Sequence, residues 1–136
     1  MDRVFLDANV LFSAAYKPDS RLLQLWKLRD TVLCSSRYAL EEARINLAGE
    51  DQQGALKKLS GFRELFEAAE HPLPRGITLP DKDSPILLAA IGSRATHLLT
   101  GDVQYFGAYF GRKVEGVSIM PPAQYLKLRE RHDKSG

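Results

Sequence analysis

The sequence has little of what marks several specialised classes of protein. Its 136 residues include one cysteine, Cys34, so no disulfide can form within the chain and a disulfide-stabilised scaffold is excluded. The first residues lack the basic and apolar stretches of a secretion signal. The longest strongly apolar run, residues 85–91, is far shorter than the roughly 20 residues that cross a bilayer. We therefore expect a cytoplasmic protein without a membrane segment.

A large excess of one charge is also missing. The chain has 19 Lys and Arg against 17 Asp and Glu, a formal net charge of +2, whereas nucleic-acid binding usually shows as a basic stripe or a strongly cationic domain. The apolar content of 44% and the charged content of 26% are typical of globular proteins and exclude extensive disorder. Length and composition predict a single domain over residues 1–132 and a frayed tail at 133–136.

The order of the apolar segments predicts an alternation of strands and helices. Short apolar runs predict strands at residues 3–7, 31–34, 97–100 and 117–119. Helical spacing and capping residues predict helices at residues 8–16, 19–29, 36–47, 51–69, from 84 or 85 onward, after 102 to about 110, and 122–131. Prolines and glycines at 71–80 predict a connection, with a short edge strand at 76–79. Such alternation is typical of a parallel sheet covered by helices.

Three carboxylates stand at the ends of these elements. Asp7 ends the first strand, Asp83 begins the most apolar helix, and Asp102 follows the strand at 97–100 across one glycine. In an open α/β sheet, strand ends and the starts of the following helices share one edge, where ligands bind. Each acid alone is explained as a helix cap or a turn residue, but several at one edge repel one another unless a cation neutralises them. Oxygen ligands without Cys or His nearby favour Mg²⁺ or Mn²⁺ over zinc.

A fourth acid comes from the helix predicted at 36–47. At about 100° per residue, Glu42 and Asn46 lie on the flank of the apolar arc of this helix, whereas Glu41 points nearly opposite. We therefore expect Glu42 to lean over the sheet and Glu41 to be a solvated surface charge. Asp81, which lies beside Lys82 in a loop, is also expected to be solvated.

Four segments of the chain, taken in order, resemble the PIN domain family, which includes the toxin ribonucleases of VapBC-type toxin–antitoxin pairs. They are residues 5–13 (FLDANVLFS), 42–47 (EARINL), 81–90 (DKDSPILLAA) and 99–102 (LTGD). Each segment is weak alone, but four in this order are specific. Carried over residue by residue, the family's acidic set falls on Asp7, Glu42, Asp83 and Asp102, with supporting polar residues at Asn9, Ser13 and Thr100.

The resemblance implies a three-layer α/β/α sandwich with a mostly parallel central sheet, and Mg²⁺- or Mn²⁺-dependent cleavage of RNA. We expect Asp7 and Asp102 to be direct metal ligands. Glu42 and Asp83 would bind metal directly or through water and orient the attacking water. The implied partners are an RNA substrate, a small antitoxin protein and a second copy of the chain. Bound cations would make the protein more positive than its formal charge, so near-neutrality does not exclude RNA.

In this scheme the neutral polar residues act through the acids. Asn9 and Thr100 would donate hydrogen bonds that hold the carboxylates in place.

Two other functions stay open. A phosphatase of the haloacid-dehalogenase type also places an aspartate at the end of its first strand, but it needs a second acid two residues later. Here that residue is Asn9, which cannot exchange a proton in that way. The other alternative is a PIN-like module that binds RNA or protein without cutting. The four acids argue against it, although their presence does not establish turnover.

Overall fold

The computed structural model describes residues 1–62, 65–68 and 70–135, and its centre is a six-stranded sheet. The strand order is β3-β2-β1-β4-β6-β5, and every neighbouring pair is parallel except β5 and β6. The strands are β1 (Asp2–Leu6), β2 (Thr31–Ser36), β3 (Leu65–Phe66), β4 (His97–Leu99), β5 (Lys113–Val114) and β6 (Val117–Met120). The mostly parallel sheet predicted from the alternation of segments is confirmed.

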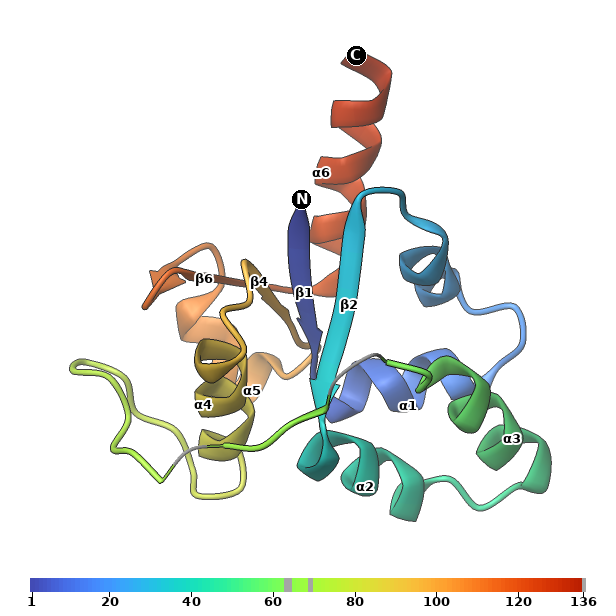
Figure 1. The fold of residues 1–136 in the computed structure, drawn as a ribbon, viewed down its shortest axis with the longest axis horizontal. Helices are drawn as coiled ribbons and strands as arrows, with labels where there is room; N and C mark the ends of the chain where they lie inside the picture. Colours follow the sequence, from blue (N-terminus) through green and yellow to red (C-terminus); the bar gives the residue numbers. More distant parts are fainter. Residues whose placement is uncertain (63–64, 69, 136) are drawn as a thin grey trace.

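Helices lie on both sides of the central strands. Figure 1 shows α4 and α5 on one side of β1 and β2 and α1 and α3 on the other, with α6 near the amino end of β1. The helices are α1 (Ala8–Tyr16), η1 (Arg21–Lys27), α2 (Arg37–Asn46), α3 (Glu50–Leu59), α4 (Ser84–Gly92), α5 (Val103–Phe106), η2 (Gly107–Tyr109) and α6 (Pro122–Ser135). This is the α/β/α arrangement expected from the sequence.

The most apolar segments form the core. Val4, Phe5 and Leu6 of β1 are fully buried, as a central parallel strand with helices on both faces requires. In α4, a proline in the first turn fits the helix start, and the following residues are almost all apolar. Among them, Leu87 is fully buried, so α4 is a core helix.

The order of the strands places a crevice at the carboxyl ends of β1 and β4. The chain passes from β1 to β2 on one side and later returns to β4 on the other side of β1. Pairing of Leu6 with Leu99 brings the residue after β1 next to the residue after β4, and the Asp7 amide donates to the Leu99 carbonyl at 3.1 Å. Such a reversal of strand order is where open α/β sheets bind ligands.

The helix predicted at 51–69 is wrong beyond Leu59. Helix α3 ends there, and Leu65 and Phe66 form β3, which pairs with the end of β2. Leu59, Phe62 and Phe66 have helical spacing, so the sequence pattern continues past the helix. Pairing of Leu65 and Phe66 with the open edge of β2 therefore outweighs the helical spacing of the apolar residues. Residues 63, 64 and 69 of this prediction lie outside the described residues.

The short edge strand predicted at 76–79 is also wrong. The described residues between 70 and 80 form no strand, and Gly76 adopts φ +84° in a turn. The backbone of Thr78 bonds instead to one side chain: its amide donates to Tyr109 Oη at 2.8 Å, and the same hydroxyl donates to its carbonyl at 3.1 Å. A side chain distant in sequence therefore replaces the expected strand pairing.

Some further details of the elements differ from the sequence-based expectation. Ser20, not Asp19, caps the second helix, which is a 3₁₀ helix. The hairpin strand β5 was not expected, and its turn places Glu115 and Gly116 at positive φ. Helix α6 continues to Ser135, past the end predicted for it at about residue 131, and residue 136 lies outside the described residues. No helix in the described part of the chain is both long enough and apolar enough to span a bilayer.

Candidate active site

A pocket of about 380 Å³ lies at the crevice between β1 and β4. It gathers side chains from the start of α1, the middle of α2, the loop before α4 and the start of α5. The residues that line it are Asp7, Ala8, Asn9, Phe12, Glu42, Ala43, Asn46, Lys82, Asp83 and Asp102. All four acids predicted from the sequence therefore share one pocket.

Asp7 is the most deeply buried of these acids, with 4% of its surface exposed. It caps α1, because its Oδ1 accepts a hydrogen bond from the Ala8 amide at 2.6 Å. Its Oδ2 accepts from Thr100 Oγ1 at 2.8 Å and from Asn9 Nδ2 at 3.1 Å. Asp7 can therefore be a helix cap and a site residue at once, because Oδ1 accepts the capping hydrogen bond and Oδ2 accepts from Thr100 and Asn9.

Thr100 and Asn9 connect the ends of β1 and β4. Besides donating to Asp7, Thr100 Oγ1 accepts from the Asp102 amide at 3.1 Å. Asn9 Oδ1 accepts from the Gly101 amide at 2.8 Å. Asp102 in turn caps α5, with Oδ1 accepting from the Tyr105 amide at 3.0 Å. Both neutral residues thus donate to the Asp7 carboxylate, and Thr100 contacts Asp102 through the backbone amide of that residue.

The two neighbouring glutamates of α2 have different surroundings. Glu42 lines the pocket, whereas Glu41 is exposed and accepts hydrogen bonds from the Arg44 guanidinium. That pairing holds the pKa of Glu41 below its ordinary value. The start of helix α2 is fixed by its N-cap residue, because Ser36 Oγ accepts a hydrogen bond from the Ala39 amide at 3.1 Å. The structure agrees with the orientation that the helical spacing predicts.

Asp83 lines the pocket and has one oxygen without a hydrogen-bond partner. It precedes α4 as the N-cap residue, yet its side chain makes no capping hydrogen bond. Its Oδ2 is buried and has no hydrogen-bond partner among the described residues. A buried carboxylate oxygen without a donor is unfavourable unless a ligand completes its surroundings.

The charges of the acids oppose one another. Burial raises the pKa of Asp7 from 3.8 to about 6, against the lowering effect of its hydrogen bonds from Thr100 and Ala8. Burial and then the charge of Asp83 raise the pKa of Glu42. Burial and then the charge of Asp102 raise the pKa of Asp83. A cation in the pocket would relieve both the burial of these charges and their repulsion.

The donor chemistry of the pocket fits a divalent metal ion. Its carboxylate oxygens, without sulfur or imidazole ligands, are of the type that Mg²⁺ and Mn²⁺ prefer, and the free Oδ2 of Asp83 could be one of them. In the described ranges, no three His, Cys, Asp or Glu side chains are already arranged to hold an ion. The pocket therefore has suitable ligand atoms but not a preformed three-ligand cage.

Ser13 is not brought into the pocket. It is exposed on α1, one turn beyond Asn9, and does not line the cavity. Conversely, the sequence-based prediction of the site omitted Lys82, Asn46 and Phe12, which do line it. Asn46 could have been included, because it lies one helical turn after Glu42 on the same face.

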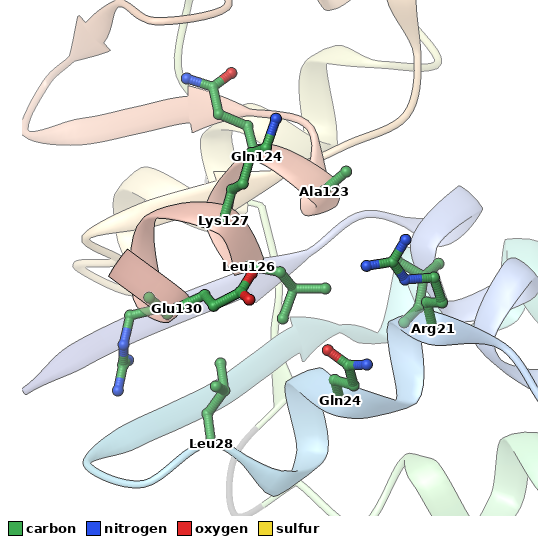
Figure 2. Close-up of a pocket in the computed structure, with 10 residues that line it drawn as sticks. Arg21, Gln24, Leu28, Ala123, Gln124, Leu126, Lys127 and Glu130 are labelled. Carbon is green, nitrogen blue, oxygen red and sulfur yellow. The ribbon is translucent and has the colours of Figure 1, made fainter. Parts of the chain in front are cut away.

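A larger hollow elsewhere lacks this chemistry. It measures about 850 Å³ and lies between η1 and α6. Figure 2 shows Leu28 and Leu126 at this hollow, together with Arg21, Lys127 and Glu130. Of its lining residues, Glu130 alone is acidic, so size does not identify the site where carboxylates gather.

The open α/β sheet and the carboxylates at its carboxyl edge define an α/β protein with an acidic ligand site. The sequence model of the PIN domain matches residues 3–104, more than half of the chain, so the chain belongs to the PIN domain family. PIN domains are generally metal-dependent nucleases. This membership excludes the haloacid-dehalogenase alternative. No curated protein and no solved structure matches the chain at a significant level.

Proposed function

We propose that this PIN domain protein is a Mg²⁺- or Mn²⁺-dependent endoribonuclease and the toxin of a toxin–antitoxin pair. One observation carries the enzymatic part of the proposal: Asp83, whose Oδ2 is buried and has no hydrogen-bond partner among the described residues, lines one pocket with three other acids. A scaffold has no need of four mutually repelling acids at one sheet edge, whereas a metal-dependent phosphodiesterase does.

The chain's own residues divide the work of RNA hydrolysis. A bound divalent ion supplies a water of lowered pKa and neutralises charge on the phosphodiester. Asp7 and Asp102, which Thr100 holds by hydrogen bonds, would hold the ion. Glu42 and Asp83 would bind the ion directly or through water and orient the attacking water.

The test compares two neighbouring aspartates. Asp83→Asn should lower Mn²⁺-dependent cleavage of a labelled RNA by at least about 100-fold. Asp81→Asn is the matched control, because Asp81 is exposed, lies two residues away and does not line the pocket; it should cleave at the wild-type rate. EDTA should abolish cleavage by both wild type and control. Undiminished cleavage by Asp83→Asn, or in EDTA, would refute the metal-dependent assignment.

The toxin part of the proposal rests on the resemblance to VapBC-type ribonucleases. Expression of the wild-type chain should arrest growth of a bacterial host, and the Asp102→Asn variant should not. A small open reading frame beside the gene should encode a partner that restores growth and blocks cleavage when co-purified. Growth arrest without such a neighbour would favour a housekeeping nuclease. A homodimer in the cytoplasm belongs to the same proposal, and light scattering and cell fractionation test it.

A further inference from the structure

One cation lies among the acids and takes no part in the proposed chemistry. Lys82 is the only Lys or Arg among the described residues that line the acidic pocket. Its charge lowers the pKa values of Glu42 and Asp83, so it lies close enough to act on both. The ordinary explanation is a solvated surface lysine that partly neutralises the acids.

The contacts of Lys82 indicate a more specific role than partial neutralisation of the acids. Its ammonium lies over the Tyr105 ring, with Nζ 5.1 Å from the ring centroid. Its backbone carbonyl accepts a hydrogen bond from Tyr38 Oη at 2.7 Å. In the described part of the chain, no ion pair joins Lys82 to a carboxylate. The lysine is therefore held beside the pocket by two tyrosines, and its ammonium can still donate to an anion.

An RNA strand needs such a cation here. Four carboxylates repel an approaching phosphodiester, and a lysine ammonium at the pocket is a point charge suited to a phosphate. Tyr38 adds a second contact, because its side chain is 40% exposed and its hydroxyl is anchored to the lysine loop. An anchored aromatic ring beside a cation suits an unpaired base next to a phosphate.

We propose that Lys82 binds a phosphate of single-stranded RNA at the acidic pocket, that Tyr38 stacks on an adjacent base, and that Tyr105 is a positioning residue that holds the lysine. This inference rests on the proposed ribonuclease function and names the form of its substrate. Duplex RNA offers no unpaired base to Tyr38, so it is bound more weakly.

The first experiment measures the ionic contact itself. Binding of a fluorescent single-stranded oligoribonucleotide is followed by anisotropy with Mn²⁺ in the Asp7→Asn background, which should not cleave it. Adding Lys82→Gln should raise Kd about tenfold at ~50 mM salt. Loss of one single-strand phosphate contact lowers the salt slope, the steepness with which log K falls with log salt concentration, by about 0.7. The ratio of the variant's Kd to the parent's Kd should therefore shrink about threefold between ~50 and ~200 mM salt. Lys82→Arg should keep the parent slope.

A matched control separates this contact from general charge loss. Lys57 is exposed on α3 and does not line the acidic pocket, so adding Lys57→Gln to the same background should leave both Kd and slope unchanged. Equal effects of the two glutamine variants would overturn the inference. So would a Lys82→Gln variant that keeps the parent salt slope, since that is the result for a lysine that only stabilises the loop.

The tyrosines are tested by conservative pairs. Tyr38→Phe keeps an aromatic ring and should bind single-stranded RNA within about threefold of the parent, whereas Tyr38→Ala should bind about tenfold more weakly. Tyr105→Phe should keep the salt slope, and Tyr105→Leu should reduce it, because only the ring attracts the ammonium. Equal Kd values for the two Tyr38 variants together with equal salt slopes for the two Tyr105 variants would overturn the roles given to these tyrosines. Tighter binding of duplex than of single-stranded RNA would do so as well.

Failure of this inference differs from failure of the proposed function. If the wild type cleaves no RNA and the Asp7→Asn protein binds none, the ribonuclease proposal falls and this inference falls with it. If the wild type cleaves RNA but Lys82→Gln behaves like its parent, only the substrate contact is refuted.

Discussion

Asp7 holds a buried charge at neutral pH, and replacing it with asparagine should stabilise the metal-free protein. Its carboxyl has an ordinary pKa of 3.8 that burial raises to about 6 in the folded chain. The folded state therefore holds the Asp7 proton more tightly than the unfolded state does. The contribution of this proton to folding is fully present below about pH 4 and is lost as the pH rises through about 6.

The size of the effect follows from the two pKa values. One pKa unit corresponds to about 1.4 kcal/mol, so ionising Asp7 in the fold costs about 3 kcal/mol of unfolding free energy at pH 7. Asparagine avoids this cost but loses part of the hydrogen bonding. An amide nitrogen in the place of Oδ2 can donate to Thr100 Oγ1 but no longer accepts from Asn9 Nδ2, a loss of about 1 kcal/mol. The expected net gain at pH 7 is about 2 kcal/mol.

The measurement is urea unfolding with EDTA at several pH values between 4 and 8. The difference in unfolding free energy between Asp7→Asn and wild type should grow from pH 4 to 6 and then level off. Asp81→Asn, an exposed control, should show no such trend. Mn²⁺ should stabilise the wild type and close part of the gap, because a ligand that binds only the folded state adds stability. An Asp7→Asn protein less stable than wild type at pH 7 in EDTA would show that the ionised Asp7 carboxylate does not destabilise the fold.

Two further predictions concern the neighbours of Asp7. Glu42→Gln should lower RNA cleavage by at least about 100-fold, whereas Glu41→Gln, whose side chain pairs with Arg44 outside the pocket, should leave it unchanged; cleavage assays on both check this. Thr100→Val removes the hydroxyl that donates to Asp7 and should lower unfolding free energy by about 1–3 kcal/mol. Thr100→Val should also move the acidic limb of the pH–rate profile to higher pH, because the Thr100 hydrogen bond lowers the pKa of Asp7. Thr100→Ser should restore both the stability and the position of the acidic limb. An acidic limb that does not move in Thr100→Val would contradict the role of Thr100 in lowering the Asp7 pKa.

The sequence was sufficient to locate the acids because their positions follow from elements with strong local signals. The apolar run of β1 ends at Asp7, and the apolar start of α4 follows Asp83, so each acid is tied to an element that composition alone indicates. Parallel pairing of β1 with β4 then brings Asp102 to the same edge without further information. The orientation of Glu42 needed only the period of a helix.

Other features depend on contacts that no local pattern records. Strand β3 has two residues and exists because β2 offers them an edge, whereas their apolar spacing continues that of α3. The loop at Thr78 is held by the hydroxyl of Tyr109, 31 residues away. The placement of Lys82 over Tyr105 likewise joins the loop before α4 to helix α5. From the sequence alone such a lysine is expected to be a solvated charge, because its neighbour in α5 is 23 residues away.

The small net charge therefore hides a strongly uneven local distribution. Four of the 17 acids share one pocket with a single lysine, so the local field is negative although the chain as a whole is slightly positive. The same carboxylates that repel RNA in the metal-free protein attract the ion that would cleave it. In the proposed function, metal binding would have two linked consequences: it would offset the cost of burying the Asp7 charge, and it would turn the pocket from a barrier to phosphate into a site for phosphate. A tightly folded metal-free form and an active site of this kind cannot both be optimal in one sequence.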